Sequence, residues 1–226
     1  KPLKRRRPRA FEVMVRGMWR IGDLLKVTGK YLGEKGIENS RLNAELLLGH
    51  VLHLDRVGLY LRFDQPLTEN EVSAYRQLIR RRLSREPLQY IRGVQEFWSL
   101  EFQVSPAVLI PRPETEVLVE TALGLCREIL GVEERVIRIL DLGTGCGAIA
   151  VALAKELPAA GVLATDISEA ALLVARRNAE RHGVSDRIRF LAGDLWDPVA
   201  REATPFDVIL SNPPYIPSPT LAGLAP

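Results

Sequence analysis

The chain has 226 residues, which is enough for two domains, and its 46% hydrophobic content is typical of a globular protein with an ordinary core. No apolar run is long enough to cross a membrane, and the N-terminus has no signal-peptide apolar region. The two cysteines lie in different sequence contexts and predict no disulfide framework. We therefore expect a cytoplasmic protein.

Residues 1–9 carry six basic residues and no acidic one. The rest of the chain holds 25 basic against 28 acidic residues, so the body is slightly acidic and does not favour nucleic acid as a partner. We interpret residues 1–18 as a disordered basic leader, upstream of a natural start at Met14 or Met18. A disordered arm for a polyanion is the alternative.

Residues 19–86 predict a small helical domain. Ser40 is expected to cap a helix. The apolar face of that helix consists of Ala44, Leu47, Leu48 and Val51. Thr68 and Glu71 predict a capping box at the start of a later helix. The apolar face of this second helix consists of Val72, Tyr75, Ile79 and Leu83.

The second of these helices also carries a run of arginines that we expect to face solvent. They are Arg76, Arg80, Arg81, Arg82 and Arg85. Such a run is typical of a solvated helix face, and the alternative is a docking face for an acidic macromolecular partner.

Residues 87–111 are predicted to form a β-hairpin linker. Leu100, Phe102 and Val104 alternate as in a strand, and residues 108–110 are interpreted as the second strand. Residues 112–226 would then form the second domain. Pro113 is expected in the first turn of its first helix, with Glu114 and Glu116 at the positive end of the helix dipole.

From residue 136 onward the apolar pattern alternates between strands and helices. The expected elements are 136–140, 148–156, 161–165, 169–182, 188–192 and 208–210. This order predicts right-handed βαβ units, hence an α/β domain with a doubly wound parallel sheet. In such a sheet the first and fourth strands are neighbours at the point where ligands bind.

A glycine-rich loop follows the first strand of this sheet. It consists of Gly143, Thr144, Gly145, Cys146 and Gly147. Glycines let the backbone turn tightly and approach a ligand closely. Together with Ala148 the spacing also fits a dinucleotide fingerprint, so spacing alone leaves that alternative open.

Acidic residues at three successive strand ends favour S-adenosylmethionine over a dinucleotide. Asp141 would repel a pyrophosphate and attract the ammonium of an amino acid. Asp166 is expected to accept hydrogen bonds from both ribose hydroxyls. Asp194 is expected to accept from the adenine amine, with Leu195 or Trp196 packing on the ring.

The fourth strand ends in Asn212, Pro213, Pro214 and Tyr215. The side-chain oxygen of Asn212 and the carbonyl of Pro213 can each accept one proton of a planar NH2 group, which fixes the nitrogen for attack on a methyl group. The prolines hold these oxygens still, and Tyr215 can lie against the flat face of the group. We therefore predict that this segment binds substrate and carries the catalysis, with Asn212 also touching the cofactor.

Three separated motifs resemble the HemK/PrmC family of peptide chain release factor glutamine methyltransferases. They are "GVQEFWSLEFQVSPAVLIPRPETE", "ILDLGTGCGAIAVALA" and "SNPPYI". The likeness covers roughly residues 20–226, and it is highly specific because the three motifs agree in order and spacing. One departure is that the family often has an aromatic residue directly after the third acid, where this chain has Leu195 and then Trp196.

The resemblance implies a Rossmann-like class I methyltransferase domain preceded by a helical substrate-docking domain and a hairpin. It implies S-adenosylmethionine as cofactor, S-adenosylhomocysteine as product, and the glutamine amide of the Gly-Gly-Gln loop of class 1 release factors as substrate. It also implies seven strands, so the sheet is expected to be incomplete in this chain. We expect a monomer with no membrane and no specific nucleic acid as partner.

Two rival functions remain at this point. An adenine exocyclic-amine methyltransferase acting on nucleic acid could use the same Asn-Pro-Pro-Tyr segment. A catalytically idle assembly partner could keep the fold, but it would be expected to lose a residue of that segment. No metal is expected, since His50 and His53 lack further ligands nearby.

Overall fold

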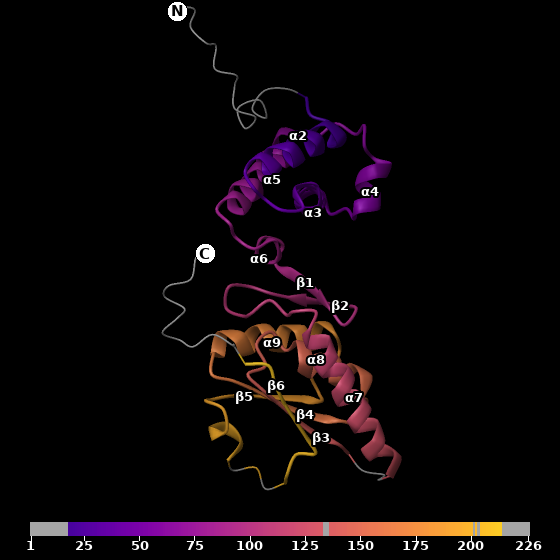
Figure 1. Cartoon of the computed structure of the whole chain (residues 1–226), viewed down its shortest axis with the longest axis vertical. Helices are drawn as coiled ribbons and strands as arrows, with labels where there is room; N and C mark the ends of the chain where they lie inside the picture. The colour runs from indigo at the N-terminus through magenta and orange to yellow at the C-terminus, as the bar shows by residue number, and fades with distance from the viewer. Residues whose placement is uncertain (1–17, 133–135, 201, 203, 214–226) are drawn as a thin grey trace, which may run out of the picture. The chain divides into compact units, whose positions relative to one another are not determined.

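The computed structural model describes residues 18–132, 136–200, 202 and 204–213 (Figure 1). The chain divides into two compact units, Lys1–Arg92 and Gly93–Pro226. The described part of the first unit is built of helices, and the second contains a β-hairpin and a parallel sheet. Of the predicted leader, only Met18 lies within the described residues.

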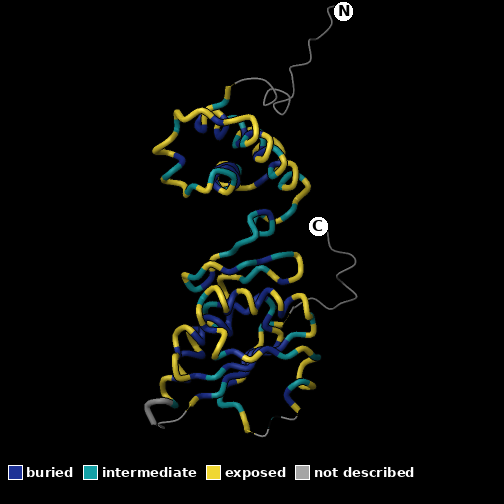
Figure 2. The backbone as a smooth tube through the Cα atoms, turned by 180° about the vertical axis from the view of Figure 1, so that it is seen from behind, coloured by how far each residue is buried: buried dark blue, intermediate teal, exposed yellow. Residues whose placement is uncertain are grey.

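The helical unit packs short amphipathic helices around one core. Its helices are α2 (Ile21–Glu34), α3 (Ser40–Leu52), α4 (Arg56–Leu61), α5 (Glu69–Leu83) and α6 (Leu88–Arg92). The buried faces of α2, α3 and α5 are visible as dark blue stretches in Figure 2. Tyr75 is fully buried in this core, and its hydroxyl donates to the carbonyl of Ala44 at 3.0 Å, which joins α5 to α3.

The predicted cap is present at the start of α5 but not at the start of α3. The predicted capping box is confirmed, because Thr68 and Glu71 bind each other's backbone N–H groups at the start of α5. The prediction that Ser40 caps α3 is wrong. Ser40 is the first helical residue, and Asn39 precedes it in the left-handed conformation, which asparagine tolerates. The amide of Asn43 donates to the carbonyl of Asn39 at 3.2 Å and holds this start.

The arginines of α5 are less uniformly exposed than predicted. Arg80 and Arg81 are exposed, and Arg81 is paired with Glu86. Arg82 is half-buried, since its Nε donates to the side-chain oxygen of Asn43 on α3 at 2.8 Å. Arg85 donates to the carbonyl of Gly36 at 2.9 Å. These bonds show that part of the run holds the helical unit together.

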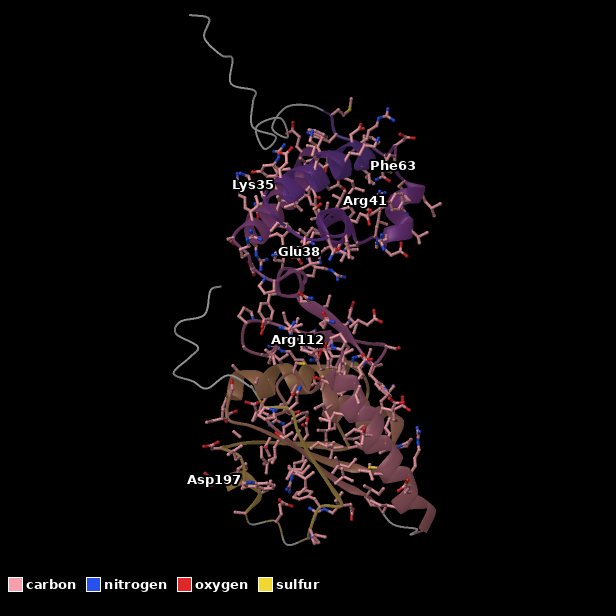
Figure 3. All side chains as sticks on the ribbon, viewed as in Figure 1. Lys35, Glu38, Arg41, Phe63, Arg112 and Asp197 are labelled. Carbon is pink, nitrogen blue, oxygen red and sulfur yellow. The ribbon has the colours of Figure 1, made fainter. Side chains whose placement is uncertain are left out.

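Glu45 of α3 is a buried carboxylate, and both of its oxygens accept hydrogen bonds. Its Oε1 accepts from Arg41 Nε at 3.0 Å and from the Tyr60 hydroxyl at 2.5 Å, and its Oε2 accepts from Arg56 Nε at 2.8 Å. Burial alone would raise the pKa of Glu45, but these hydrogen bonds outweigh it and hold the pKa below its ordinary value. Arg41, labelled in Figure 3, reaches Glu45 from one turn earlier on the same helix.

The second unit begins with the hairpin of β1 (Val94–Phe97) and β2 (Leu100–Gln103), paired antiparallel. Trp98 and Ser99 form the turn, and both have a positive φ, near 53° and 55°. A two-residue turn with two positive φ values matches the twist of paired strands. Residues 108–110 are therefore not the partner strand, and residues 88–92 form α6 rather than hairpin. Both points correct the prediction for 87–111.

The parallel sheet follows the predicted rhythm. Its strands are β3 (Arg138–Leu142), β4 (Gly161–Asp166), β5 (Ile188–Ala192) and β6 (Val208–Ser211), in the spatial order β5-β4-β3-β6. The predicted neighbourhood of the first and fourth strands is thereby confirmed. Helices α8 (Ala148–Glu156) and α9 (Glu169–Arg181) lie on one face of this sheet (Figure 1). The predicted α/β domain with a parallel sheet is therefore present in the described residues.

The opposite face of the sheet is covered by the segment between β5 and β6, which includes the short helix η1 (Asp197–Val199). Leu140, Leu142 and Leu163 pack there against Val199. Helix α7 (Thr115–Val132) packs on α8. It begins at Thr115, so Pro113 lies in the turn before it rather than in its first turn. No helix in the described part of the chain has the length and apolar character that a membrane crossing requires.

Candidate active site

The register of the sheet brings the predicted site segments to one edge. Leu142 of β3 is paired with Thr165 of β4 on one side and with Ser211 of β6 on the other. The residues that follow these strands therefore start at the same level. Gly143 and Asn212 are neighbours across the carboxyl end of the sheet, as the sequence predicted.

The three glycines of the loop have different reasons to be glycine. All have positive φ, at 72° for Gly143, 56° for Gly145 and 81° for Gly147. A Cβ built on Gly143 or Gly145 would meet nothing within 4 Å, so both face open space. A Cβ on Gly147 would lie 3.1 Å from the Cβ of Ala175 on α9. The first two glycines therefore leave room for a ligand, and the third permits helix packing.

Backbone and side-chain hydrogen bonds fix the loop to the next strand. The N–H of Thr144 donates to the carbonyl of Thr165 at 2.8 Å. The N–H of Gly145 donates to Oδ2 of Asp166 at 2.9 Å, and Oδ1 of Asp166 accepts from the N–H of Ser168 at 2.9 Å. Asp166 is half-buried, and it joins the loop after β3 to the loop after β4.

Asp141 lies beneath the loop rather than on its surface. The residue is fully buried, and its Oδ2 accepts from the Thr144 hydroxyl at 2.6 Å. Its Oδ1 is buried without a hydrogen-bond partner. Burial raises the pKa of Asp141 to about 6, against the opposing effect of the Thr144 bond. The carboxylate therefore supports the loop from below, and its contact with a ligand ammonium stays a prediction.

The third predicted acid lies in an open segment. Asp194 is exposed, and so are Leu195 and Trp196 beside it, at 60% and 53%. Leu195 has a positive φ of 40°, which is unusual for a residue with a branched side chain. Asp197, labelled in Figure 3, donates its N–H to the carbonyl of Asp194 at 2.9 Å and closes this turn. Both Leu195 and Trp196 are therefore exposed enough for an adenine ring to pack on either of them.

Asn212 is held by a residue that sequence reasoning missed. Its Nδ2 donates to the hydroxyl of Thr115 at 2.9 Å, and Thr115 is the buried first residue of α7. This bond fixes the nitrogen end of the amide toward α7 and the oxygen at the opposite end. Pro213 is exposed, whereas Pro214 and Tyr215 lie outside the described residues. The signal for Thr115 was its place in the "PRPETE" stretch, whose proline and acidic residues predicted a helix start but assigned Thr115 no role.

Cys146 and Asn178 form a second connection that the sequence did not reveal. Cys146 is buried, and burial raises the pKa of its thiol to about 12. Its carbonyl accepts from Nδ2 of Asn178 at 2.8 Å. Asn178 lies within the ordinary amphipathic pattern of α9, and no local signal distinguishes it from its neighbours.

The donor set of this edge fits S-adenosylmethionine better than a phosphate-containing ligand. The loop segment from Asp141 to Gly147 contains an acid and no base, and its open side lies over Gly143 and Gly145. The buried, unpaired oxygen of Asp141 adds negative character below the loop. In the part of the chain that the structure describes, no three His, Cys, Asp or Glu side chains gather in a way that could hold a metal ion.

Family models and a solved structure match parts of this chain. Family models match residues 23–93 as a PrmC N-terminal domain and residues 125–219 as a methyltransferase small domain. A solved METTL16 methyltransferase domain overlaps part of the fold, with a TM-score of 0.43 and 25% identity over 52% of this chain and 53% of that chain.

Curated relatives extend over nearly the whole chain. The release factor glutamine methyltransferase of Geobacter sulfurreducens is 50% identical over 209 residues, which are 92% of this chain and 70% of that protein. That of Chlorobaculum tepidum is 49% identical over 210 residues, covering 92% and 71%. The chain therefore belongs to the release factor glutamine methyltransferases, a family of S-adenosylmethionine-dependent enzymes.

Proposed function

We propose that the protein transfers a methyl group from S-adenosylmethionine to the side-chain amide nitrogen of the glutamine in the Gly-Gly-Gln motif of class 1 release factors, and so modulates translation termination. The observation that carries this proposal is the register between β3 and β6. Because Leu142 is paired with Ser211, the amide of Asn212 starts beside the open side of the glycine loop.

The cofactor is assigned to the loop and to the acids around it. When bound, S-adenosylmethionine supplies a methyl group on a positively charged sulfonium and leaves as S-adenosylhomocysteine. We assign Asp166 to the ribose hydroxyls, since it is half-buried and already oriented by two backbone N–H groups. We assign Asp194 to the adenine amine, with the exposed side chains of Leu195 and Trp196 beside the ring.

Asn212 is assigned the substrate amide. An amide nitrogen is a poor nucleophile because its lone pair is delocalised into the carbonyl group. Two acceptors, the side-chain oxygen of Asn212 and the carbonyl of Pro213, would orient its two protons and favour the charge that develops during attack. The bond from Asn212 to Thr115 supports this role, because it fixes which end of the asparagine amide can act as acceptor. Pro214 and Tyr215 keep the roles predicted from the sequence.

Proton removal needs no dedicated base before the transfer. The substrate nitrogen would take the methyl group that bound S-adenosylmethionine supplies, and the sulfur would keep the electrons of the broken carbon–sulfur bond. The methylated nitrogen then carries an extra proton, which is acidic enough to pass to water. The residues of this chain therefore act by orientation and electrostatics rather than by proton abstraction.

We further propose that the helical unit provides a second docking area for the release factor and that the protein acts in the cytoplasm as a monomer. The exposed Arg80 side chain supports a docking face that meets acidic residues. Arg82 and Arg85 bind groups within their own unit.

The test is methyl transfer to intact release factor with labelled S-adenosylmethionine. We expect label on the Gly-Gly-Gln glutamine and none on release factor in which alanine replaces that glutamine. A short Gly-Gly-Gln peptide should be a much poorer substrate, because it lacks the remote contacts that position the amide. The Asn212→Ala variant should transfer methyl on the order of 10²-fold more slowly, or slower still, at the same enzyme concentration.

A duplex DNA arm addresses the adenine alternative. An adenine must leave its helix at a cost of a few kcal/mol, whereas a glutamine on a flexible loop needs no such step. Methyl incorporation into DNA together with none into release factor would overturn the proposed function.

A further inference from the structure

Asn178 on α9 is a fully buried polar residue whose side chain is saturated with hydrogen bonds. Its Nδ2 donates to the carbonyl of Cys146 at 2.8 Å and to the carbonyl of Gln103 at 3.0 Å. Its Oδ1 accepts from the N–H of Gln103 at 2.7 Å. Both donors and the acceptor of the amide are therefore engaged with backbone groups of two other segments.

These two segments are far apart in the sequence and differ in kind. Cys146 belongs to the glycine loop that we assign to the cofactor. Gln103 is the last residue of β2, where its ladder partner on β1 is Val94. The N–H and C=O of Gln103 bind the Asn178 amide as a neighbouring strand would, so one side chain completes the edge of the hairpin.

Other contacts fasten the hairpin to the helices without touching the loop. Glu101 pairs with Arg181, and the carbonyl of Glu101 lies 3.0 Å from Nε2 of His182. At the turn, the N–H of Trp98 donates to Glu116 at 2.8 Å, and its indole donates to Glu156 at 3.0 Å. These contacts attach the hairpin to the helices at other points, which makes the bond from Asn178 to the loop a separate feature.

We propose that Asn178 is a positioning residue that couples the hairpin to the cofactor loop. It fixes the carbonyl of Cys146 and hence the loop between Gly145 and Gly147, and it ties that position to β2. Coupling of this kind is reciprocal: if an ordered hairpin favours the loop conformation that binds the ligand, ligand binding must favour the ordered hairpin. The inference rests on the proposed placement of the cofactor at this loop.

The ordinary alternative is a core asparagine that only stabilises the fold. In both cases, truncation to alanine leaves buried carbonyls of Cys146 and Gln103 without donors, which is destabilising. The two cases differ in what a ligand at the loop does to the hairpin, 43 sequence positions away from Cys146. With a purely structural residue, the ligand would slow exchange of the Gln103 amide no more than it slows amides that exchange by global unfolding.

The decisive measurement is hydrogen exchange of the Gln103 amide with and without S-adenosylhomocysteine. In the wild-type protein the ligand should slow this exchange by about fivefold or more, since it stiffens the loop that Asn178 holds. Exchange at Gln103 that is unchanged by saturating ligand would overturn the coupling. This measurement needs no variant and is independent of catalytic activity.

Variants then locate the coupling. Asn178→Ala, and Asn178→Asp as a variant that keeps the side-chain shape and the acceptor but removes both donors, should raise the dissociation constant of S-adenosylhomocysteine by about tenfold. The KM for S-adenosylmethionine should rise similarly, while kcat at saturating cofactor falls by less than about threefold. Binding is measured at a temperature where melting curves show each variant folded.

Arg181→Ala is the matched control, because it removes an exposed contact between the same helix and the same hairpin. It should change the dissociation constant by less than about twofold. A folded Asn178→Ala protein that binds S-adenosylhomocysteine as tightly as wild type would overturn the proposal. Wild-type protein that does not bind S-adenosylhomocysteine would instead contradict the cofactor assignment itself, and with it the coupling.

Discussion

Each of the two units buries a carboxylate almost completely, and the two carboxylates are paired very differently. Glu45 of the helical unit binds two arginines and a tyrosine, and hydrogen bonds hold its pKa below the ordinary value in spite of burial. Asp141 of the methyltransferase unit binds one hydroxyl, keeps one unpaired oxygen, and has a pKa raised to about 6.

The difference indicates two purposes for buried charge. A carboxylate whose hydrogen-bond partners all come from its own unit stabilises one fixed packing arrangement and needs no ligand to complete its bonding. A carboxylate that is half-paired costs stability in the isolated chain, and such costs concentrate at functional sites. Asp141 lies below the glycine loop, beside the strand that leads to Asn212, so its position agrees with that rule.

The largest expected effect tests whether this edge of the sheet is functional at all. Asn212→Ala removes one of two acceptors aimed at the reacting nitrogen, so turnover at saturating cofactor should fall on the order of 10²-fold or more. Cofactor affinity, measured by calorimetry, should change much less. Ser211→Ala is the control, since it removes only a hydroxyl bound to the Leu142 carbonyl. Affinity that collapses while turnover survives would contradict the role of Asn212.

Replacement of Asp166 should lower cofactor affinity rather than turnover. Asp166→Ala removes the acceptor for the Gly145 N–H and the acceptor assigned to the ribose, worth about 2–3 kcal/mol of cofactor binding. The dissociation constant should therefore rise by about 30- to 150-fold. Ser168→Ala, which removes the side-chain cap of α9, should lower thermal stability with little loss of affinity. Equal affinities for Asp166→Ala and wild type would reduce Asp166 to a structural role.

Replacement of Glu45 tests the role of the fully paired carboxylate. Glu45→Ala should lower the free energy of unfolding of the helical unit by about 2 kcal/mol, because it leaves Tyr60 and the two arginines without their common partner. Urea unfolding monitored by circular dichroism measures this change. Affinity for S-adenosylhomocysteine should stay within about twofold of wild type, and a large loss would mean that the two carboxylates do not divide structure from binding.

Replacement of Asp141 should have the smallest effect, and it should stabilise the protein rather than destabilise it. Its pKa rises from 3.8 to about 6 on folding, so its contribution to stability is full below pH 3.8 and is lost as the pH rises through about 6. Asp141→Asn should therefore raise the free energy of unfolding at pH 7.5 by about 1 kcal/mol, less than the full linkage value because the amide is also polar. Urea unfolding at pH 4 and pH 7.5 checks this, and a variant less stable than wild type at pH 7.5 would refute it.

The sequence predicted those parts of the fold that depend on local pattern. Strand and helix periods gave the order of the sheet, and the glycine spacing located the loop. The hairpin register was missed because Trp98 and Ser99 form the turn without the glycine or asparagine that usually marks positive φ. The apolar run of residues 108–110 was instead interpreted as the second strand, and the structure leaves it outside any strand.

Side-chain partners in the site were harder to predict because they join distant segments. Thr115 and Asn212 are 97 positions apart, and Asn178 and Gln103 are 75 apart, so no local pattern connects them. The position of Asp141 was accessible in principle. Leu140 and Leu142 face the cluster with Val199, so alternation along β3 turns Asp141 to the opposite face, under α8.

The buried thiol of Cys146 has a consequence for kinetics. A thiol that is 3% exposed and has a pKa near 12 reacts with alkylating reagents only when the segment around it opens. In a chain whose other cysteine, Cys126, is replaced by serine, the rate of labelling would therefore report how often the loop leaves its closed state. The labelling rate of Cys146 would thus follow the opening of the loop. Its decrease in the presence of S-adenosylhomocysteine would measure how far the ligand prolongs the closed form.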